Sequence, residues 1–175
     1  MKGIMIASNS SKTHVVIVGG GAAALEAKYA IRDFAGDRAA VEVLALERVI
    51  SVDPENHRLL RDDRSELSYD FLVAAIPPHT GRRIVGLPFD GTDSLPIDHY
   101  GRIEGCSREY AAGLATTSRV RFQGTTAEHA DVVASAIASE AEWPQPESVG
   151  PESVKSSRAS NLGYSRRKDQ IATPG

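Results

Sequence analysis

The pattern of apolar and polar residues changes its period twice near the start of the chain. Residues 14–18, HVVIV, are nearly all β-branched and apolar, which is typical of a strand buried on both faces. After three glycines, residues 22–34 carry apolar side chains at helical spacing, and Gly36 marks the end of this helix. Residues 40–47, AVEVLALE, read as the next strand. The chain therefore opens with a strand, turn, helix, strand unit.

In residues 48–76, short apolar runs alternate with turn-forming residues. Turns such as PENH, residues 54–57, separate the runs at the spacing of hairpins and leave no room for a helix. We therefore expect a β-meander over this range. Residues 77–94 are rich in proline and glycine and are predicted to form a loop with little regular structure.

The closing part, residues 95–142, combines short strands with a final helix. Residues 95–105 indicate two short strands about a Tyr-Gly turn, and residues 109–113 a further buried strand. A helix is predicted over about residues 125 to 142, because the apolar residues there form one stripe. The stripe consists of Ala127, Ala130, Val133, Ala134, Ile137, Ala138 and Ala141.

The order of these elements predicts an α/β fold of the Rossmann-like type. It has a βαβ start at residues 13–47, a three-stranded β-meander insertion at 48–76 and a C-terminal helix. We assign residues 1–143 to this one domain, because 175 residues with 41% hydrophobic content leave room for a substantial core. Proline, serine, glutamate and arginine dominate residues 144–175, which predicts a disordered tail.

Composition and charge narrow the classes of partner. A net charge of −3 and an isoelectric point near 6.0 give no long-range attraction for nucleic acid or anionic lipid. The sequence has no apolar run near the roughly 20 residues of a membrane helix, so we expect a soluble cytoplasmic protein. Cys106 is the single cysteine, which excludes an internal disulfide and a Cys-x-x-Cys pair. The five histidines show no metal-ligand spacing, and we predict no metal site and no catalytic side chain.

The glycines after the first strand fit the pattern G-x-G-x-x-G/A, in the strand-to-helix context that this motif requires. The first glycine permits a tight turn, the third lets a pyrophosphate approach the backbone, and a small sixth residue allows close helix packing. The helix N-terminus then offers free N–H groups to phosphate oxygens. The candidate cofactor-binding residues of this turn are Gly19, Gly20, Gly21, Ala22, Ala23 and Ala24.

Glu47 follows Ala24 by 23 residues, close to where an acid accepts hydrogen bonds from an adenosine ribose. A solvated glutamate that begins the next strand is the alternative interpretation of Glu47.

Three stretches together resemble FAD-dependent pyridine nucleotide-disulfide oxidoreductases, and among these the type II NADH dehydrogenase-like flavoproteins. They are HVVIVGGGAAALEA, RVISVDPENHRLLRDDRSELSYDFLV and LPIDHYGRIEGCSREYAAGLATT. The resemblance implies a split FAD-binding domain in which Tyr69-Asp70 ends the meander and Gly113 belongs to the closing motif. It also implies that the helix beginning near Gly124 faces the pyrimidine of the flavin.

The sequence departs from this family pattern in three places. Leu114 stands where the family has an aspartate that hydrogen-bonds the ribityl chain of FAD. Only 13 residues separate Asp70 from Ile84, too few for the βαβ domain that binds NAD(P)H in the family. Residues 46–49 pass directly into the meander, where the family has a long helical insertion beside the flavin.

Three functional hypotheses remain open at this point. The resemblance implies an FAD-dependent oxidoreductase that passes electrons from NAD(P)H through flavin to a quinone or another acceptor. The departures favour a catalytically inactive remnant that binds an adenine dinucleotide or serves as an interaction module. A third hypothesis is that the glycine turn holds NAD(H) in place of FAD. The missing segments would also expose sheet edges, which predicts a homodimer or poor solubility.

Overall fold

The computed structural model describes residues 11–76, 82–113, 116–118 and 126–144, all within the compact unit formed by residues 1–144. Every structural statement below concerns these residues. The predictions made for Leu114, Gly124 and the tail beyond residue 144 lie outside them.

A four-stranded parallel sheet in the order β2-β1-β6-β8 forms the centre of the domain. Its strands are β1 (Thr13–Gly19), β2 (Ala39–Leu44), β6 (Phe71–Ala75) and β8 (Glu109–Ala111). Strands β6 and β8 are buried along their whole length, and β1 is buried from Val15 to Gly19. This burial explains why they read as continuous apolar runs in the sequence.

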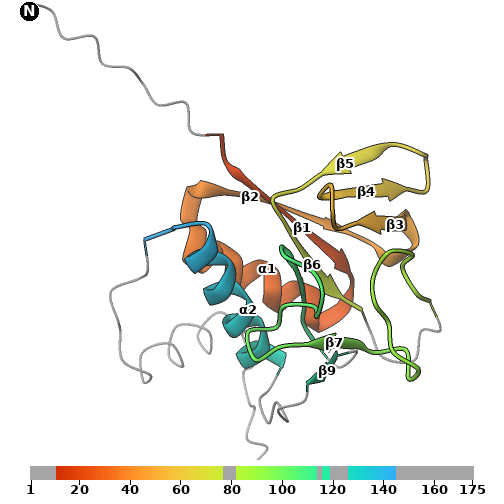
Figure 1. Cartoon of the computed structure of the whole chain (residues 1–175). Coiled ribbons are helices and arrows are strands. Elements are labelled where there is room, and N and C mark those ends of the chain that lie inside the picture. Colours follow the sequence, from red (N-terminus) through yellow and green to blue (C-terminus); the bar gives the residue numbers. More distant parts are fainter. Residues whose placement is uncertain (1–10, 77–81, 114–115, 119–125, 145–175) are drawn as a thin grey trace, which may run out of the picture. The chain divides into compact units, whose positions relative to one another are not determined.

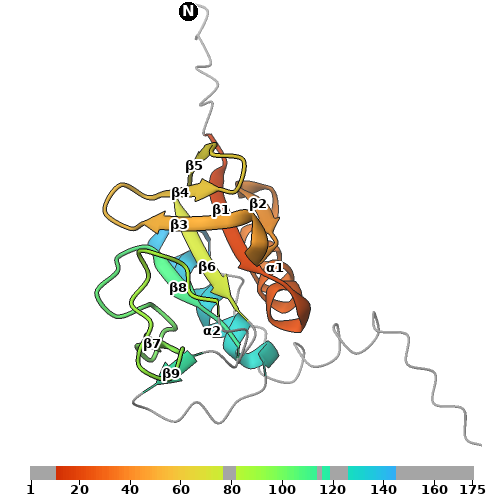
Figure 2. The same ribbon diagram turned by 90° about the vertical axis from the view of Figure 1, so that its right-hand side faces the viewer.

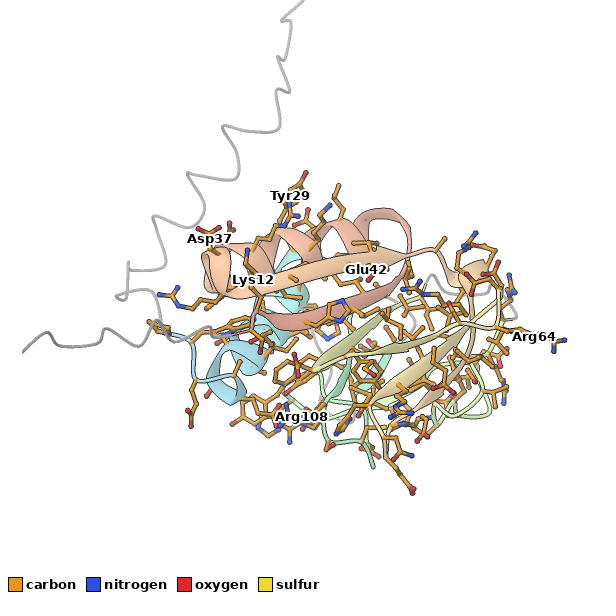
Figure 3. All side chains as sticks on the ribbon, turned by 90° about the horizontal axis from the view of Figure 1, so that it is seen from above. Lys12, Tyr29, Asp37, Glu42, Arg64 and Arg108 are labelled. Atoms are coloured by element: carbon orange, nitrogen blue, oxygen red, sulfur yellow. The ribbon has the colours of Figure 1, made fainter. Side chains whose placement is uncertain are left out.

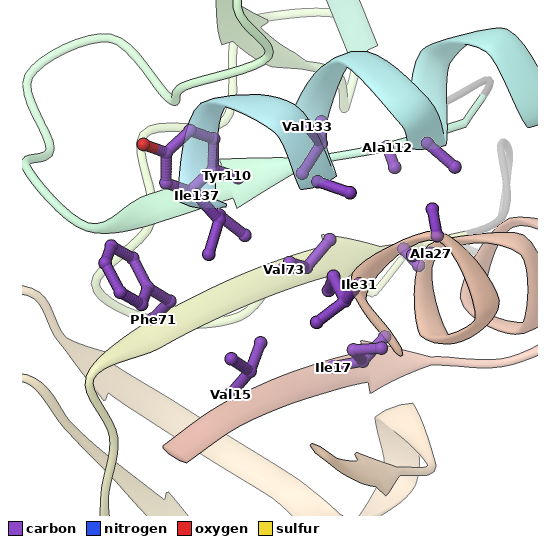
Figure 4. Packing of buried hydrophobic residues seen from close by; sticks show 14 of the residues in the cluster. Val15, Ile17, Ala27, Ile31, Phe71, Val73, Tyr110, Ala112, Val133 and Ile137 are labelled. Carbon is purple, nitrogen blue, oxygen red and sulfur yellow. The ribbon is translucent and has the colours of Figure 1, made fainter. Parts of the chain in front are cut away.

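Two helices cover one face of this sheet and pack against each other (Figure 1). They are α1 (Gly21–Ala35), which runs into the short helix η1 (Gly36–Arg38), and α2 (Thr126–Glu140). Figure 4 shows the resulting core, in which Ile17 and Val73 of the sheet lie among Ile31 of α1 and Val133 and Ile137 of α2. Alanines make up much of the helix surfaces turned toward this core, which lets the two helices approach closely.

The opposite face of the sheet is covered by an antiparallel meander and by residues 84–103 (Figure 2). The meander consists of β3 (Val49–Asp53), β4 (Arg58–Arg61) and β5 (Glu66–Ser68), with the short helix η2 (Leu46–Arg48) leading into it. Strand β7 (Leu95–Ile97) pairs with β9 (Thr116–Ser118). The domain thus has three layers, and the predicted α/β class with a meander insertion and a C-terminal helix is confirmed.

The details differ from the sequence predictions in four places. Strand β6 leaves the predicted meander range and joins the parallel sheet, where all five of its residues are buried. Strand β2 ends at Leu44, so Glu47 lies on η2 and not in the strand as predicted. The second short strand expected after residue 95 is reduced to single bridges, including Ile97 to Ile103. Strand β9 was not predicted, because its three residues carry no period of their own.

Polar side chains cover the outer surfaces of both outer layers (Figure 3). Some apolar residues are exposed as well, including Tyr29, which projects away from α1, and Val43 at the edge strand β2. None of the helices within the described ranges combines the length and apolar character needed to cross a membrane. The homodimer expected from exposed sheet edges stays a prediction.

A buried carboxylate joins the meander to the sheet at the N-terminal end of β8. Glu109 is fully buried and accepts a 2.8 Å hydrogen bond from the hydroxyl of Tyr69 and one from the backbone N–H of Arg108. The ring of His57 lies 3.3 Å from the same carboxylate. Burial, together with the bond to Glu109, raises the pKa of the Tyr69 hydroxyl, which therefore stays a proton donor at neutral pH. These bonds compensate for removing the carboxylate from water.

We predict that Tyr69→Phe lowers the free energy of unfolding by about 1 to 3 kcal/mol, because it leaves a buried carboxylate short of a donor. Urea unfolding at pH 7.5 measures this loss. Tyr100→Phe is the matched control, since Tyr100 is 53% exposed, and its effect should stay within about 0.5 kcal/mol. Equal stability of the two variants would show that the Tyr69 hydroxyl contributes nothing to the fold.

Candidate functional site

The carboxyl ends of β1, β6 and β8 meet at one edge of the sheet. Gly19 at the end of β1 pairs with Ala75 of β6, and the N–H of Ala112 donates to the carbonyl of Ala74 at 3.0 Å. From β1 the chain passes through α1 to β2, which lies on one side of β1 in the sheet. Strands β6 and β8 lie on the other side of β1. In open α/β sheets, ligands bind at the carboxyl edge where the strand order reverses in this way.

Gly19 allows β1 and β6 to approach each other at this edge. Its φ is +134°, and a Cβ atom at this position would lie 2.0 Å from the carbonyl oxygen of Ala75. Residues other than glycine rarely adopt this backbone conformation, and the carbonyl oxygen of Ala75 leaves no space for a side chain. The structure therefore gives the first glycine of the motif a local packing role.

The turn that follows Gly19 has no described residue packed against it at the N-terminus of α1. Gly20 is the N-cap residue and makes no side-chain hydrogen bond to the helix, and the first turn carries no acidic residue. Gly21 has a φ of +75°, and a Cβ atom built on Gly20 or Gly21 meets none of the described residues within 4 Å. Since the first N–H groups of a helix have no partner within the helix, this uncapped end fits an anion such as a pyrophosphate.

The three alanines of the motif differ in their surroundings. Ala22 is exposed, Ala23 is half-buried, and Ala24 is buried between α1 and the sheet. The small Ala24 side chain lets the helix pack close to β1, as the motif predicts.

Gly113 approaches the same turn from a distant part of the sequence. It follows β8 with a φ of +96°, and a Cβ atom on it would lie 2.8 Å from the Cβ atom of Ala23. The hydroxyl of Thr116 donates to its carbonyl at 2.8 Å, and its own N–H donates to Nδ1 of His129 at 3.3 Å. The structure therefore places Gly113 beside the glycine turn, and we call Gly113 and Thr116, which follow β8, the closing segment.

Glu47 lies at this edge of the sheet as well. Because β1 and β2 run parallel with Val18 opposite Leu44, the chain beyond Leu44 emerges beside the glycine turn. Glu47 is exposed on η2, three residues beyond the end of β2, so its carboxylate faces solvent.

Tyr69 and Asp70 lie at the opposite, N-terminal edge of the sheet. Asp70 accepts a 2.7 Å hydrogen bond from the N–H of His14, and its own N–H donates to the carbonyl of His14. With Tyr69 bonded to Glu109, this pair connects the meander to β1 and β8. Both residues serve the fold and lie away from the candidate site.

The sequence analysis missed His129. This residue lies on the buried side of α2, and burial lowers the pKa of its imidazole, which favours the neutral ring at neutral pH. Its spacing of four and eight residues from Val133 and Ile137 places it in the apolar stripe and was the available signal.

Other chemistry receives little support among the described residues. No cluster of three or more His, Cys, Asp or Glu side chains there could hold a metal ion. Burial raises the pKa of the Cys106 thiol to about 11, so the reactive thiolate is scarce at neutral pH. The geometry supports binding of an anionic ligand better than covalent catalysis by a side chain.

Comparison with solved structures shows the same fold in an oxidoreductase. NADH:rubredoxin oxidoreductase from Clostridium acetobutylicum superposes with a TM-score of 0.53 at 8% identity, over 81% of this chain and 78% of that chain. At this identity the likeness concerns the fold alone. It confirms the fold that the sequence resemblance implies.

Two further structures match more weakly. Sulfide:quinone oxidoreductase from the hyperthermophilic bacterium Aquifex aeolicus has a TM-score of 0.36 at 16% identity, over 75% of this chain. An FAD-dependent pyridine nucleotide-disulphide oxidoreductase from Desulfovibrio vulgaris has a TM-score of 0.35 at 22% identity, over 51% of this chain. The chain spans only 33% and 24% of the lengths of these two proteins. No protein-family model and no curated protein matches the sequence.

We predict that Gly19→Ala destabilises the domain by at least about 3 kcal/mol or prevents folding, because the added methyl group would overlap the Ala75 carbonyl oxygen. Gly20→Ala is the control, since Gly20 has a φ of −150° and open space around it, and it should cost less than about 1 kcal/mol. Thermal unfolding followed by circular dichroism compares the two. A Gly19→Ala protein as stable as the control would contradict the close approach of β1 and β6.

Proposed function

We propose that this chain binds an adenine dinucleotide at the carboxyl edge of its parallel sheet, with FAD as the cofactor. The observation that carries the proposal is the uncapped N-terminus of α1, which lies where the strand order reverses and has no described residue packed against its glycines. The backbone N–H groups of residues 21–23 would hold the pyrophosphate, and Glu47 would accept hydrogen bonds from the adenosine ribose.

The closing segment completes the proposed site. Gly113 lies against Ala23, so a ligand on the glycine turn would extend along the segment that follows β8. The family resemblance assigns the flavin half to residues 113, 114 and the N-terminus of α2 near Gly124. The partial positive charge of a helix N-terminus would stabilise negative charge on the flavin there.

On this basis we propose an FAD-dependent oxidoreductase of the NAD(P)H dehydrogenase-like group, with a quinone or another molecule as electron acceptor. The bound FAD would supply the capacity to accept and pass on a hydride equivalent. The described residues of the chain bind and orient the dinucleotide, and we assign none of them a proton transfer.

A second candidate is an inactive module that binds ADP-like ligands or NAD(H). Two observations favour it: the leucine at position 114, and the 13 residues between Asp70 and Ile84 in place of a domain for NAD(P)H. In this case the glycine turn would still bind the ADP portion, because that portion is common to FAD and NAD(H). Affinity for the flavin half therefore distinguishes the two candidates.

The decisive experiment is to add excess FAD to the full chain, remove free ligand and record the visible absorption spectrum of the protein. We expect retained flavin, and its bleaching by NADH without oxygen would support the oxidoreductase proposal.

We predict that Gly21→Ala weakens FAD and ADP binding at least tenfold, since its methyl group would occupy the space left for the pyrophosphate.

Gly105→Ala is the matched control for this variant. Gly105 also has a positive φ, +83°, and open space around it, so both substitutions should cost about 1 to 2 kcal/mol of stability. Only Gly21→Ala should weaken nucleotide binding. A colourless protein would contradict FAD as the cofactor, and equal ADP affinity of the two variants would contradict the glycine turn as the site.

We predict that Leu114→Asp strengthens FAD binding about tenfold to a hundredfold, because an aspartate there would accept a hydrogen bond from the ribityl chain. ADP lacks a ribityl chain, and its affinity should stay unchanged. Fluorescence titration with FAD and calorimetric titration with ADP measure the two affinities. A parallel gain for both ligands would show that the substitution acts on the fold and not on the flavin half.

A further inference from the structure

His129 connects the closing segment to helix α2 at the candidate site. Only 5% of this residue is exposed, and its Nδ1 atom accepts the N–H of Gly113 at 3.3 Å. An imidazole nitrogen accepts a hydrogen bond only when it carries no proton. The contact therefore requires a neutral ring with its proton on Nε2.

The bond from His129 fixes a residue that has little freedom to move. Gly113 is held on its carbonyl side by the Thr116 hydroxyl, and a Cβ atom on Gly113 would lie 2.8 Å from Ala23. Ala23 belongs to the first turn of α1, whose N–H groups face the proposed pyrophosphate position. The position of the His129 ring thus determines how the closing segment meets the glycine turn.

The turn at residues 98–101 confines the other side of the ring. A Cβ atom on Gly101 would lie 3.6 Å from Nε2 of His129 and 2.5 Å from Cγ2 of Val133. The ring is therefore enclosed between α2 and this turn and has little space in which to rotate away from Gly113.

The ionisable groups on the surrounding elements have contacts of their own. In the 98–101 turn, Asp98 accepts the N–H groups of Tyr100 and Arg102. On β8, the hydroxyl of Tyr110 donates to Glu140, and Arg102 pairs with the same carboxylate. On α2 itself, the nearest acidic residues in sequence are Glu128 and Asp131. Burial is the cause that lowers the pKa of His129.

We propose that His129 is a positioning residue for dinucleotide binding: its neutral ring holds Gly113 against the first turn of α1, and its protonation releases the closing segment. A protonated ring can no longer accept the Gly113 N–H, and it places a charge in a buried site. The affinity for the dinucleotide therefore falls as pH falls through the titration of His129. This inference rests on the proposed FAD site.

The test is the dissociation constant for FAD, measured by fluorescence titration of the full chain from pH 5.5 to 8.0. The pyrophosphate of FAD is a diester and does not titrate in this range. We expect the affinity of the wild type to fall from pH 7.5 to pH 5.5 by less than about tenfold, because the lowered pKa of His129 leaves part of the rings neutral at pH 5.5. His129→Asn keeps an acceptor in nearly the same place and cannot be protonated there, so its affinity should be independent of pH. His129→Leu should bind about tenfold more weakly at every pH.

A control separates positioning from a general loss of the fold at low pH. Because the pKa of His129 is lowered in the folded state, its stabilising effect is full above the unfolded value near 6.5 and is lost as pH falls below it. Circular dichroism at each pH therefore verifies that every sample is folded during the titration. His14→Asn should keep the pH dependence of the wild type, since His14 bonds the carbonyl of Ser68 at the opposite edge of the sheet.

The outcomes are distinguishable. Absence of FAD binding at pH 7.5 overturns the proposed function and this inference together. Binding at pH 7.5 with a constant affinity down to pH 5.5 overturns the role of His129 and leaves the proposed function standing. If His129→Leu fails to fold, the profiles of the wild type and His129→Asn still decide. The amide signal of Gly113 in nuclear magnetic resonance spectra should also titrate with the His129 ring, and a constant signal would contradict the proposal.

Discussion

The carbonyl oxygen of Ala75 occupies the place where any residue other than glycine at position 19 would carry its Cβ atom. This contact fixes the separation of β1 and β6 at the edge where the strand order reverses. It also sets the direction in which the chain leaves β1 and enters α1. Gly20 and Gly21, which follow this contact, have no described residue within 4 Å of the place of a Cβ atom. One close approach between two backbones thus lies directly beside the proposed binding site.

Gly113 lies beside the glycine turn although it follows Ala23 by ninety positions in the sequence. Gly113 can approach Ala23 because glycine has no Cβ atom. His129 and Thr116 form hydrogen bonds with the N–H and the carbonyl of Gly113. Both contacts at this edge are therefore made by glycines that favour backbone proximity over side-chain packing. The opposite edge uses different means, since buried polar groups around Glu109 connect the meander to the sheet there. The proposed binding site and the contacts that attach the meander thus lie at opposite ends of the strands.

Much of this arrangement could be predicted from the sequence. The β-branched run 14–18, the glycine turn and the alanine-rich helices have periods strong enough to identify their elements without tertiary information. The family resemblance, and not a local pattern, also related Gly113 to the glycine turn, and the structure places the two close together; their joint role in binding stays a proposal. The end of β2 was misplaced by three residues, because AVEVLALE continues its apolar character into η2.

The contacts that depend on tertiary packing could not be predicted from the sequence. Nothing local to Glu109 shows that its carboxylate is fully buried, because its side-chain partners His57 and Tyr69 lie 52 and 40 residues away in the sequence. His129 looked unremarkable among the five histidines until its neighbours Gly101 and Gly113 were known. The three-residue strand β9 has too few side chains to show a period, and its pairing with β7 defines it.

The late position of α2 in the chain bears on how the domain is made. Helix α2 covers the sheet face that β1, α1 and β6 share, yet it begins at residue 126. During synthesis on the ribosome, the apolar side chains of that face are complete long before their cover has been translated. A nascent chain of this kind exposes its core to other hydrophobic surfaces in the meantime, which is the situation that chaperones relieve. The order of these segments along the chain therefore places a period of aggregation risk before α2 emerges.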